Sequence, residues 1–153
     1  GDDGTIGDGG NTTDVWELAD DLDPGSTGTP LEQPLGSSAV INTTGTFSFA
    51  TTGYWLIRLY VHIYFGAPTD YRSISISGTN DNSTYVNLSS SQASSDTGGR
   101  RHTVPTEALI KVTDITNDKV ILHSALGAGD YLFGNTNYSR TYVVFQKLAD
   151  PDS

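Results

Sequence analysis

The side chains that could do chemistry in this sequence are few and scattered. There is no cysteine, and the three histidines, His62, His102 and His123, lie on separate segments. None of them belongs to a His-x-His or His-Glu-x-x-His pattern, the spacings that bring two imidazoles onto one zinc ion. The sequence also lacks the Gly-x-Ser-x-Gly motif that presents a nucleophilic serine. We therefore predict no catalytic residues and a protein that is not an enzyme.

Carboxylates and amides are more numerous, and they gather at predicted turns. Asp side chains at turns usually bond the local backbone, so we assign no pair of catalytic carboxylates. Hard cations bind several oxygens from flexible loops, and residues 80–82 together with Asp114, Asn117 and Asp118 could supply them. Their spacing matches no known calcium loop. We predict no metal site and no cofactor, with Ca²⁺ at Asp114, Asn117 and Asp118 as the weaker alternative.

A different pattern marks residues 54–65. The odd positions are all apolar, which predicts one continuous core face at the period of a β-strand. The even positions carry aromatic, Leu, Arg and His side chains, which is the composition of a protein–protein interface. The last predicted strand also has apolar residues on both sides. The predicted interface residues are Tyr54, Leu56, Arg58, Tyr60, His62, Tyr64, Tyr142 and Val144. The alternative is an enclosed central strand or an ordinary aromatic surface.

A chain of 153 residues has the length of one ordinary domain. Its net charge of −10 is uneven, because residues 1–36 hold seven Asp and two Glu without any Lys or Arg. We predict an extended acidic arm over residues 1–36, with an edge strand near residues 14–18, and a nearly neutral body over residues 37–150. The acidity argues against nucleic acid as a partner. No apolar stretch reaches the roughly 20 residues of a membrane span.

Glycine occupies positions 1, 4, 7 and 10 of the arm. A three-residue glycine period is the signature of a collagen triple helix, because only glycine fits where three chains meet. One interpretation of these triplets in residues 1–10 is the end of a longer collagen-like stalk. The alternative is a flexible Gly/Asp linker.

The body is predicted to be all-β. Residues that are β-branched, aromatic, Ser, Thr or Asn dominate it, and Gly, Pro, Asn and Asp punctuate it at short intervals. This pattern predicts a β-sandwich or jelly roll. The basic cluster at residues 100–102 is expected in a solvated loop, with the acidic arm or a partner as its alternative contact. The expected strands cover residues 46–50, 54–65, 72–77, 84–89, 107–113, 119–124 and 140–148.

Three segments together resemble the C1q/TNF-like jelly-roll family over residues 37–149. Phe47-Ser-Phe-Ala-Thr-Thr-Gly-Tyr-Trp-Leu-Ile is similar to the motif that leads into the long inner strand of that fold. Asn117-Asp-Lys-Val resembles the Gly-Asp-x-Val turn of the family, with Asn in place of Gly, and Tyr142-Val-Val-Phe-Gln-Lys-Leu resembles its closing strand. The resemblance implies a ten-stranded sandwich that associates as a tight homotrimer, often at the tip of a collagen-like stalk.

The lack of cysteine, the polar loops and the ending Ser-Arg-Thr-Tyr-x-x-Phe-x-x-Leu-Ala-Asp are similar to the C1q-like heads of bacteriophage virion proteins. The resemblance implies a virion structural protein on the surface of the extracellular particle: a capsid decoration protein, a head fibre or a fibre tip. Its expected partners are further copies of itself, other capsid proteins bound through the arm, and host-surface glycans. The alternative function is a carbohydrate-binding module or adhesin whose exposed tyrosines stack on sugars.

Overall fold

The computed structural model describes residues 40–43, 45–133 and 141–151, and all regular structure in these ranges is β. The predicted all-β class is confirmed, whereas the acidic arm, the glycine-period segment 1–10 and the strand near 14–18 lie outside the described residues. Within the described ranges there is no helix able to cross a membrane. The strands are β1 (Val40–Thr43), β2 (Thr46–Phe49), β3 (Gly53–Phe65), β4 (Thr69–Thr79), β5 (Val86–Ser95), β6 (Arg100–Val112), β7 (Lys119–Ala125), β8 (Tyr131–Leu132) and β9 (Tyr142–Ala149).

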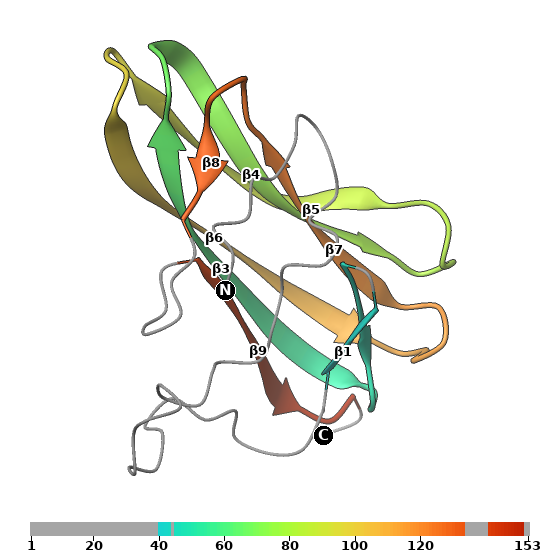
Figure 1. The fold of residues 1–153 in the computed structure, drawn as a ribbon. Coiled ribbons are helices and arrows are strands. Elements are labelled where there is room, and N and C mark those ends of the chain that lie inside the picture. Colours follow the sequence, from blue (N-terminus) through green and yellow to red (C-terminus); the bar gives the residue numbers. More distant parts are fainter. Residues whose placement is uncertain (1–39, 44, 134–140, 152–153) are drawn as a thin grey trace, which may run out of the picture.

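The strands form two facing antiparallel sheets (Figure 1). One sheet has the order β1-β2-β7-β4-β5. In the other, β3 is central: β6 pairs along one edge, while β9 and β8 share the other edge, β9 beside Tyr54–Tyr60 and β8 beside Ile63 and Tyr64. The long strand β3 therefore holds the second sheet together and fixes where the side chains of its neighbours lie.

The core fills the space between the sheets and follows the two-residue period of β3. Every odd residue of β3 is buried, and Ile57, Ile63 and Phe65 have no exposed surface. Ile74, Ile76, Val120 and Leu122 meet them from the opposite sheet, and Phe47 and Phe49 close the core at one end. Burying one such side chain stabilises the fold by about 1.5–3 kcal/mol. The predicted core face is confirmed.

The hairpin of β5 and β6 departs from the predicted pattern. Residues 100–102 were expected in a loop, yet they begin β6, a strand of 13 residues that pairs with the whole of β3. A tight turn makes this possible: Gly99 adopts a φ of 78°, and its N–H donates to the carbonyl oxygen of Phe65 at 2.7 Å. Glycine adopts this left-handed conformation without steric cost. Arg101 lies on the outward face of β6, whereas Arg100 and His102 lie on the same side as Val104, opposite Phe65 and Ile63 of β3.

The body has two distinct ends. Val40 pairs with Phe49, and Ala149 pairs with Tyr54, so the described body begins and ends at the Gly53 end of β3. We call this end the base. The loops at residues 66–68, 96–99 and 126–130 gather at the Phe65 end, which we call the tip. In Figure 1 the tip lies toward the upper left and the base toward the lower right. The first and the last strand of the described body therefore both reach the base.

Candidate functional site

The outer face of the β3 sheet brings the predicted interface residues together. All six even residues of β3 are half-buried on this face. Residues directly opposite each other in an antiparallel pair share a face, so Tyr142 lies beside Tyr60 and Val144 beside Arg58. We call this surface the aromatic face. It consists of Tyr54, Leu56, Arg58, Tyr60, His62, Tyr64, Tyr131, Phe133, Tyr142, Val144 and the outward side chains of β6.

Ring stacking organises the aromatic face. Tyr60 stacks on Tyr142 with a centroid separation of 4.8 Å, and Tyr64 stacks on Tyr131 at 4.6 Å. Phe133 places its edge against His62 at 5.6 Å and packs on Tyr131 at 4.9 Å. Such pairs contribute about 0.5–1.5 kcal/mol beyond the area they bury. The rings are therefore held in fixed positions and present a rigid surface.

Cations lie over the rings of the aromatic face. The guanidinium carbon of Arg101 lies 4.5 Å from the ring centroid of Phe133, and Lys111 Nζ lies 5.5 Å from that of Tyr54. Arg58 pairs with Glu107, its opposite residue on β6, at 3.4 Å between Nε and Oε2. This ion pair is exposed to solvent and contributes little to stability. Three cations and one carboxylate make the face weakly positive.

The two sheets present different surfaces to solvent. Leu109 is 63% exposed and Val144 is 40% exposed on the aromatic face, at its centre near Leu56. On the other sheet Ile74 and Ile76 point inward, and the outward positions pair Ser73 with Gln92 and Ser75 with Ser90. The same sheet also exposes Tyr71, Val86 and Leu88, on β4 and β5. A contiguous patch of stacked aromatic and aliphatic side chains, as on the aromatic face, marks an interaction site.

Sequence reasoning did not find Leu109, Tyr131 and Phe133, which complete the aromatic face, and it named Arg101 only as part of the basic cluster at residues 100–102. Leu109 carried a usable signal, because β6 alternates between the buried Val104, Thr106 and Ala108 and exposed odd positions. Tyr131 carried none, since β8 has only two residues and is placed by its pairing with β3.

A groove of about 390 Å³ runs beside the aromatic face, where the edges of the two sheets approach each other. Ser89 Oγ and Thr106 Oγ1 lie 2.6 Å apart and join β5 to β6 at its floor. The ring of Tyr60 and the Arg58–Glu107 ion pair reach the same groove. Its lining consists of Arg58, Tyr60, Ser89, Ser90, Ser91, Pro105, Thr106 and Glu107. The groove thus combines serine and threonine hydroxyls, the guanidinium of Arg58 and the carboxylate of Glu107 with the aromatic ring of Tyr60.

The residues considered for calcium shape the turn between β6 and β7. Asp118 Oδ2 accepts from the N–H groups of Thr113 at 2.6 Å and Asp114 at 2.9 Å. Asp114 Oδ1 accepts from the Thr116 N–H at 2.8 Å, and Asp114 Oδ2 accepts from Asn117 Nδ2 at 2.8 Å. Their oxygens are thus engaged within the turn. No group of three His, Asp or Glu side chains within the described ranges is arranged to hold a metal ion.

Asp81 likewise accepts hydrogen bonds within its own turn, which connects β4 and β5. Its Oδ1 accepts from the N–H groups of Thr84 at 2.7 Å and Ser83 at 2.9 Å and from the Thr79 hydroxyl at 2.7 Å. These hydrogen bonds, led by that from the Thr84 backbone, hold the pKa of Asp81 well below its usual value of 3.8. The bond from the Thr116 backbone likewise lowers the pKa of Asp114.

These carboxylates predict a fold that weakens in acid. A carboxyl whose pKa is lower in the folded state stabilises the fold fully above the unfolded value of 3.8 and loses this effect as the pH falls toward the folded value. We expect the free energy of unfolding, measured with urea, to fall as the pH drops below 3.8. Asp81→Asn should make that fall shallower, and an unchanged pH profile for this variant would contradict the assignment.

The three histidines lie in different surroundings. His62 Nδ1 lies 3.0 Å from Thr103 Oγ1, and the ring of His102 meets Phe65 edge-on at 5.1 Å. His123 belongs to the other sheet, where it pairs with Ser75, and burial lowers its pKa. The structure therefore does not bring the three imidazoles to one site.

A buried ion pair ties the loops of the tip. Asp130 has a fully buried side chain and pairs with Arg72. Its Oδ1 accepts from the Gly66 N–H at 2.8 Å, and its Oδ2 accepts from the Gly127 N–H at 2.9 Å. Burial by itself would raise the pKa of Asp130, but Arg72 and the two N–H groups outweigh burial and lower it. One carboxylate therefore connects β4 with two loops.

The tip loops also depend on close backbone contacts. A Cβ added to Gly66 would lie 2.4 Å from the carbonyl oxygen of Gly129. We expect Gly66→Ala to lower the free energy of unfolding by about 1–3 kcal/mol, because the backbone must shift to admit the methyl group. Urea unfolding measures this loss. Ala67→Gly, in the same loop, is the control that adds no atom, and equal losses in the two variants would contradict the steric explanation.

Comparisons with known proteins agree on the fold. No family model and no curated protein matches the sequence. Several solved structures match the fold. An Eiger TNF structure from S. frugiperda aligns with a TM-score of 0.59 at 18% identity, and the alignment covers 74% of this chain and 71% of the Eiger chain. Murine APRIL at pH 5.0 aligns with a TM-score of 0.59 at 12% identity and covers 74% of this chain and 80% of its own. The chain therefore folds as a TNF-like jelly-roll sandwich, as its motifs predicted.

Proposed function

We propose that the domain is a non-enzymatic assembly module that forms a homotrimer through its aromatic face. The stacked rings of the aromatic face, together with the exposed Leu109 and Val144 beside them, carry this proposal. Association removes such a surface from water, which is the main favourable term in most protein–protein contacts. The family that the sequence resembles associates as trimers, and closed threefold symmetry sets one part of each copy's surface against a different part of the next copy.

In the particle, this head projects from the virion surface. The described body begins and ends at its base, and we assign the contact with other capsid proteins to the acidic arm. The tip then points outward, where three copies of each loop give avidity toward host-surface glycans. This placement as a decoration protein, head fibre or fibre tip rests on the resemblance to phage heads. Mass spectrometry of purified particles tests it, because a chain absent from them is not a virion protein.

The oligomeric state is the direct test of the assembly role. Sedimentation velocity of the full chain at micromolar concentration is expected to give the mass of three chains. A single species with the mass of one chain would refute the proposal, whatever the location of the protein. The variants that separate assembly through the aromatic face from assembly elsewhere are described in the Discussion.

Carbohydrate binding is the second candidate function, and the groove beside Tyr60 favours it. The Arg58–Glu107 pair offers a donor and an acceptor to neighbouring sugar hydroxyls, while Pro105 and the edge of Tyr60 offer apolar contact. A glycan array separates the two functions. A stable trimer without glycan signal supports assembly alone, whereas glycan binding by a monomer that Tyr60→Ala abolishes supports the carbohydrate-binding module.

A further inference from the structure

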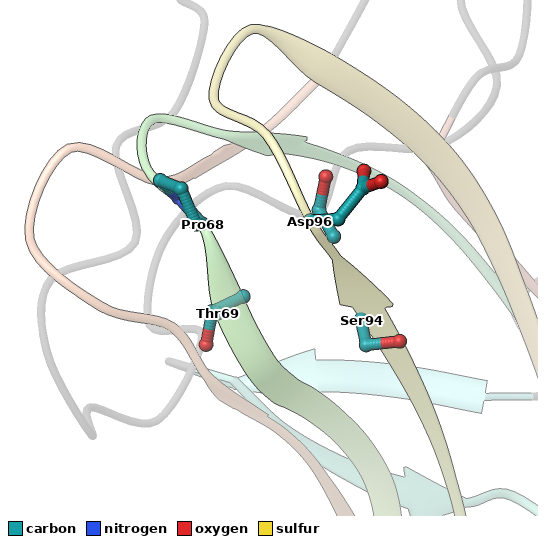
Figure 2. Close-up of a pocket in the computed structure, with 5 residues that line it drawn as sticks. Pro68, Thr69, Ser94 and Asp96 are labelled. Atoms are coloured by element: carbon teal, nitrogen blue, oxygen red, sulfur yellow. The ribbon is translucent and has the colours of Figure 1, made fainter.

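A second hollow lies at the tip, away from the aromatic face. It measures about 590 Å³ and is lined by Pro68, Thr69, Ser94, Ser95 and Asp96. Figure 2 shows Pro68 and Thr69 on one side and Ser94 and Asp96 on the other. Its volume suits a small ligand. This tip pocket lies at the end opposite the base and outside the aromatic face, so a proposal for it does not depend on the proposed trimer.

A β-bulge opens the sheet at this point. Thr69 pairs with Ser95, but the next pair joins Arg72 to Ala93, so β4 has one residue more than β5 between them. Bulges of this kind interrupt the ladder and redirect side chains, and they are frequent beside binding sites. The extra backbone separates β4 from β5 beside Ser94. The hollow is therefore built into the strand pairing and is not only a gap between surface loops.

Hydrogen bonds fix both walls of the tip pocket. Arg72, which Asp130 holds, donates from Nη1 to Thr69 Oγ1, so the buried ion pair also positions this wall. On the other wall the buried Ser95 hydroxyl donates to the carbonyl oxygen of Thr97 at 2.7 Å. A ligand that binds here does not have to order the backbone first, and preorganisation of this kind favours affinity.

The lining selects the chemistry of the ligand. Asp96 is exposed and makes no hydrogen bond or ion pair within the described residues, so its two oxygens can accept from a ligand. Ser94 adds a hydroxyl that both donates and accepts, and Pro68 adds an apolar ring. Calcium is disfavoured because it needs several oxygen ligands and the lining offers one carboxylate. Anions are disfavoured because no cationic side chain lines the pocket. An organic cation would find no aromatic ring for a cation–π contact.

We propose that the tip pocket binds a neutral saccharide, with Asp96 accepting from two neighbouring hydroxyls and the C–H face of the sugar against Pro68. The test uses the full chain and saturation-transfer NMR with glucose, galactose, mannose and their disaccharides. We expect at least one of them to bind and Asp96→Asn to weaken its binding about tenfold, the effect of losing a hydrogen bond to a charged acceptor. Asp150→Asn, at the base beside Lys147, is the matched control and should bind as the parent does.

Three outcomes would overturn the proposal. The first is that none of these saccharides gives a signal with the parent chain. The second is that the sugar binds outside the tip pocket: Asp96→Asn then binds it as tightly as the parent does. Loss of binding in Tyr60→Ala would show the same, and it would place the sugar in the groove beside Arg58. The third is that ethanolamine competes for the pocket as well as the sugar does, which would make it an amine site. Unchanged thermal melting of Asp96→Asn shows that weaker binding does not reflect unfolding.

Discussion

Replacing Asp130 with alanine is expected to lower the free energy of unfolding by about 3–5 kcal/mol, the usual result of removing one partner of a buried ion pair. Arg72 keeps its charge, and only 22% of its side chain is exposed, so water compensates it poorly. The same change leaves the N–H groups of Gly66 and Gly127 without the oxygens that accept from them. Three interactions therefore disappear together, and those with Arg72 and Gly66 join segments that are distant in sequence.

Urea unfolding of the full chain measures this loss at neutral pH. Asp150→Ala is the matched control, because Asp150 is exposed and its pair with Lys147 lies at the base. An exposed pair of this kind contributes about 0–1 kcal/mol. If the two variants lose the same amount, Asp130 is not the connection that holds the tip. Arg72→Met in the Asp130→Ala background should recover part of the loss, since it removes the uncompensated charge.

The sequence predicted those elements whose pattern is local. In β3 every odd position is apolar, so its period of two determined the strand, its core face and the six outward residues without any knowledge of its neighbours. In β6 the inward residues include Thr106 and the small Ala108, and Pro105 interrupts the run, so only its second half was predicted.

Features that depend on pairing between distant segments could not be read from the chain. Asp130 and Arg72 are 58 residues apart, and nothing in either segment indicates the other. The same is true of Tyr64 and Tyr131, which stack only because β8 pairs with the end of β3. The aromatic face was therefore found in part, from β3 and β9, and the tip pocket was not found at all.

The aromatic face predicts that Leu109→Glu converts the trimer into a monomer. Leu109 is 63% exposed in the single chain, so a glutamate there meets water and should change the free energy of unfolding of the monomer by only about 0.5 kcal/mol. In the trimer the same carboxylate would be buried against apolar and aromatic groups, and burying an unpaired charge costs several kcal/mol. Sedimentation velocity at micromolar concentration is expected to show three chains for the parent and one for the variant.

Val86→Glu provides the matched control, because Val86 is 57% exposed on β5 of the other sheet, so the same charge enters outside the aromatic face. It should remain a trimer. Tyr60→Ala and Tyr142→Ala should each weaken association without a change of charge, since each removes half of a stacked pair. If the Leu109→Glu protein stays trimeric, the interface does not include the aromatic face. Dissociation by Val86→Glu as readily as by Leu109→Glu would show that added charge, and not the aromatic face, decides assembly.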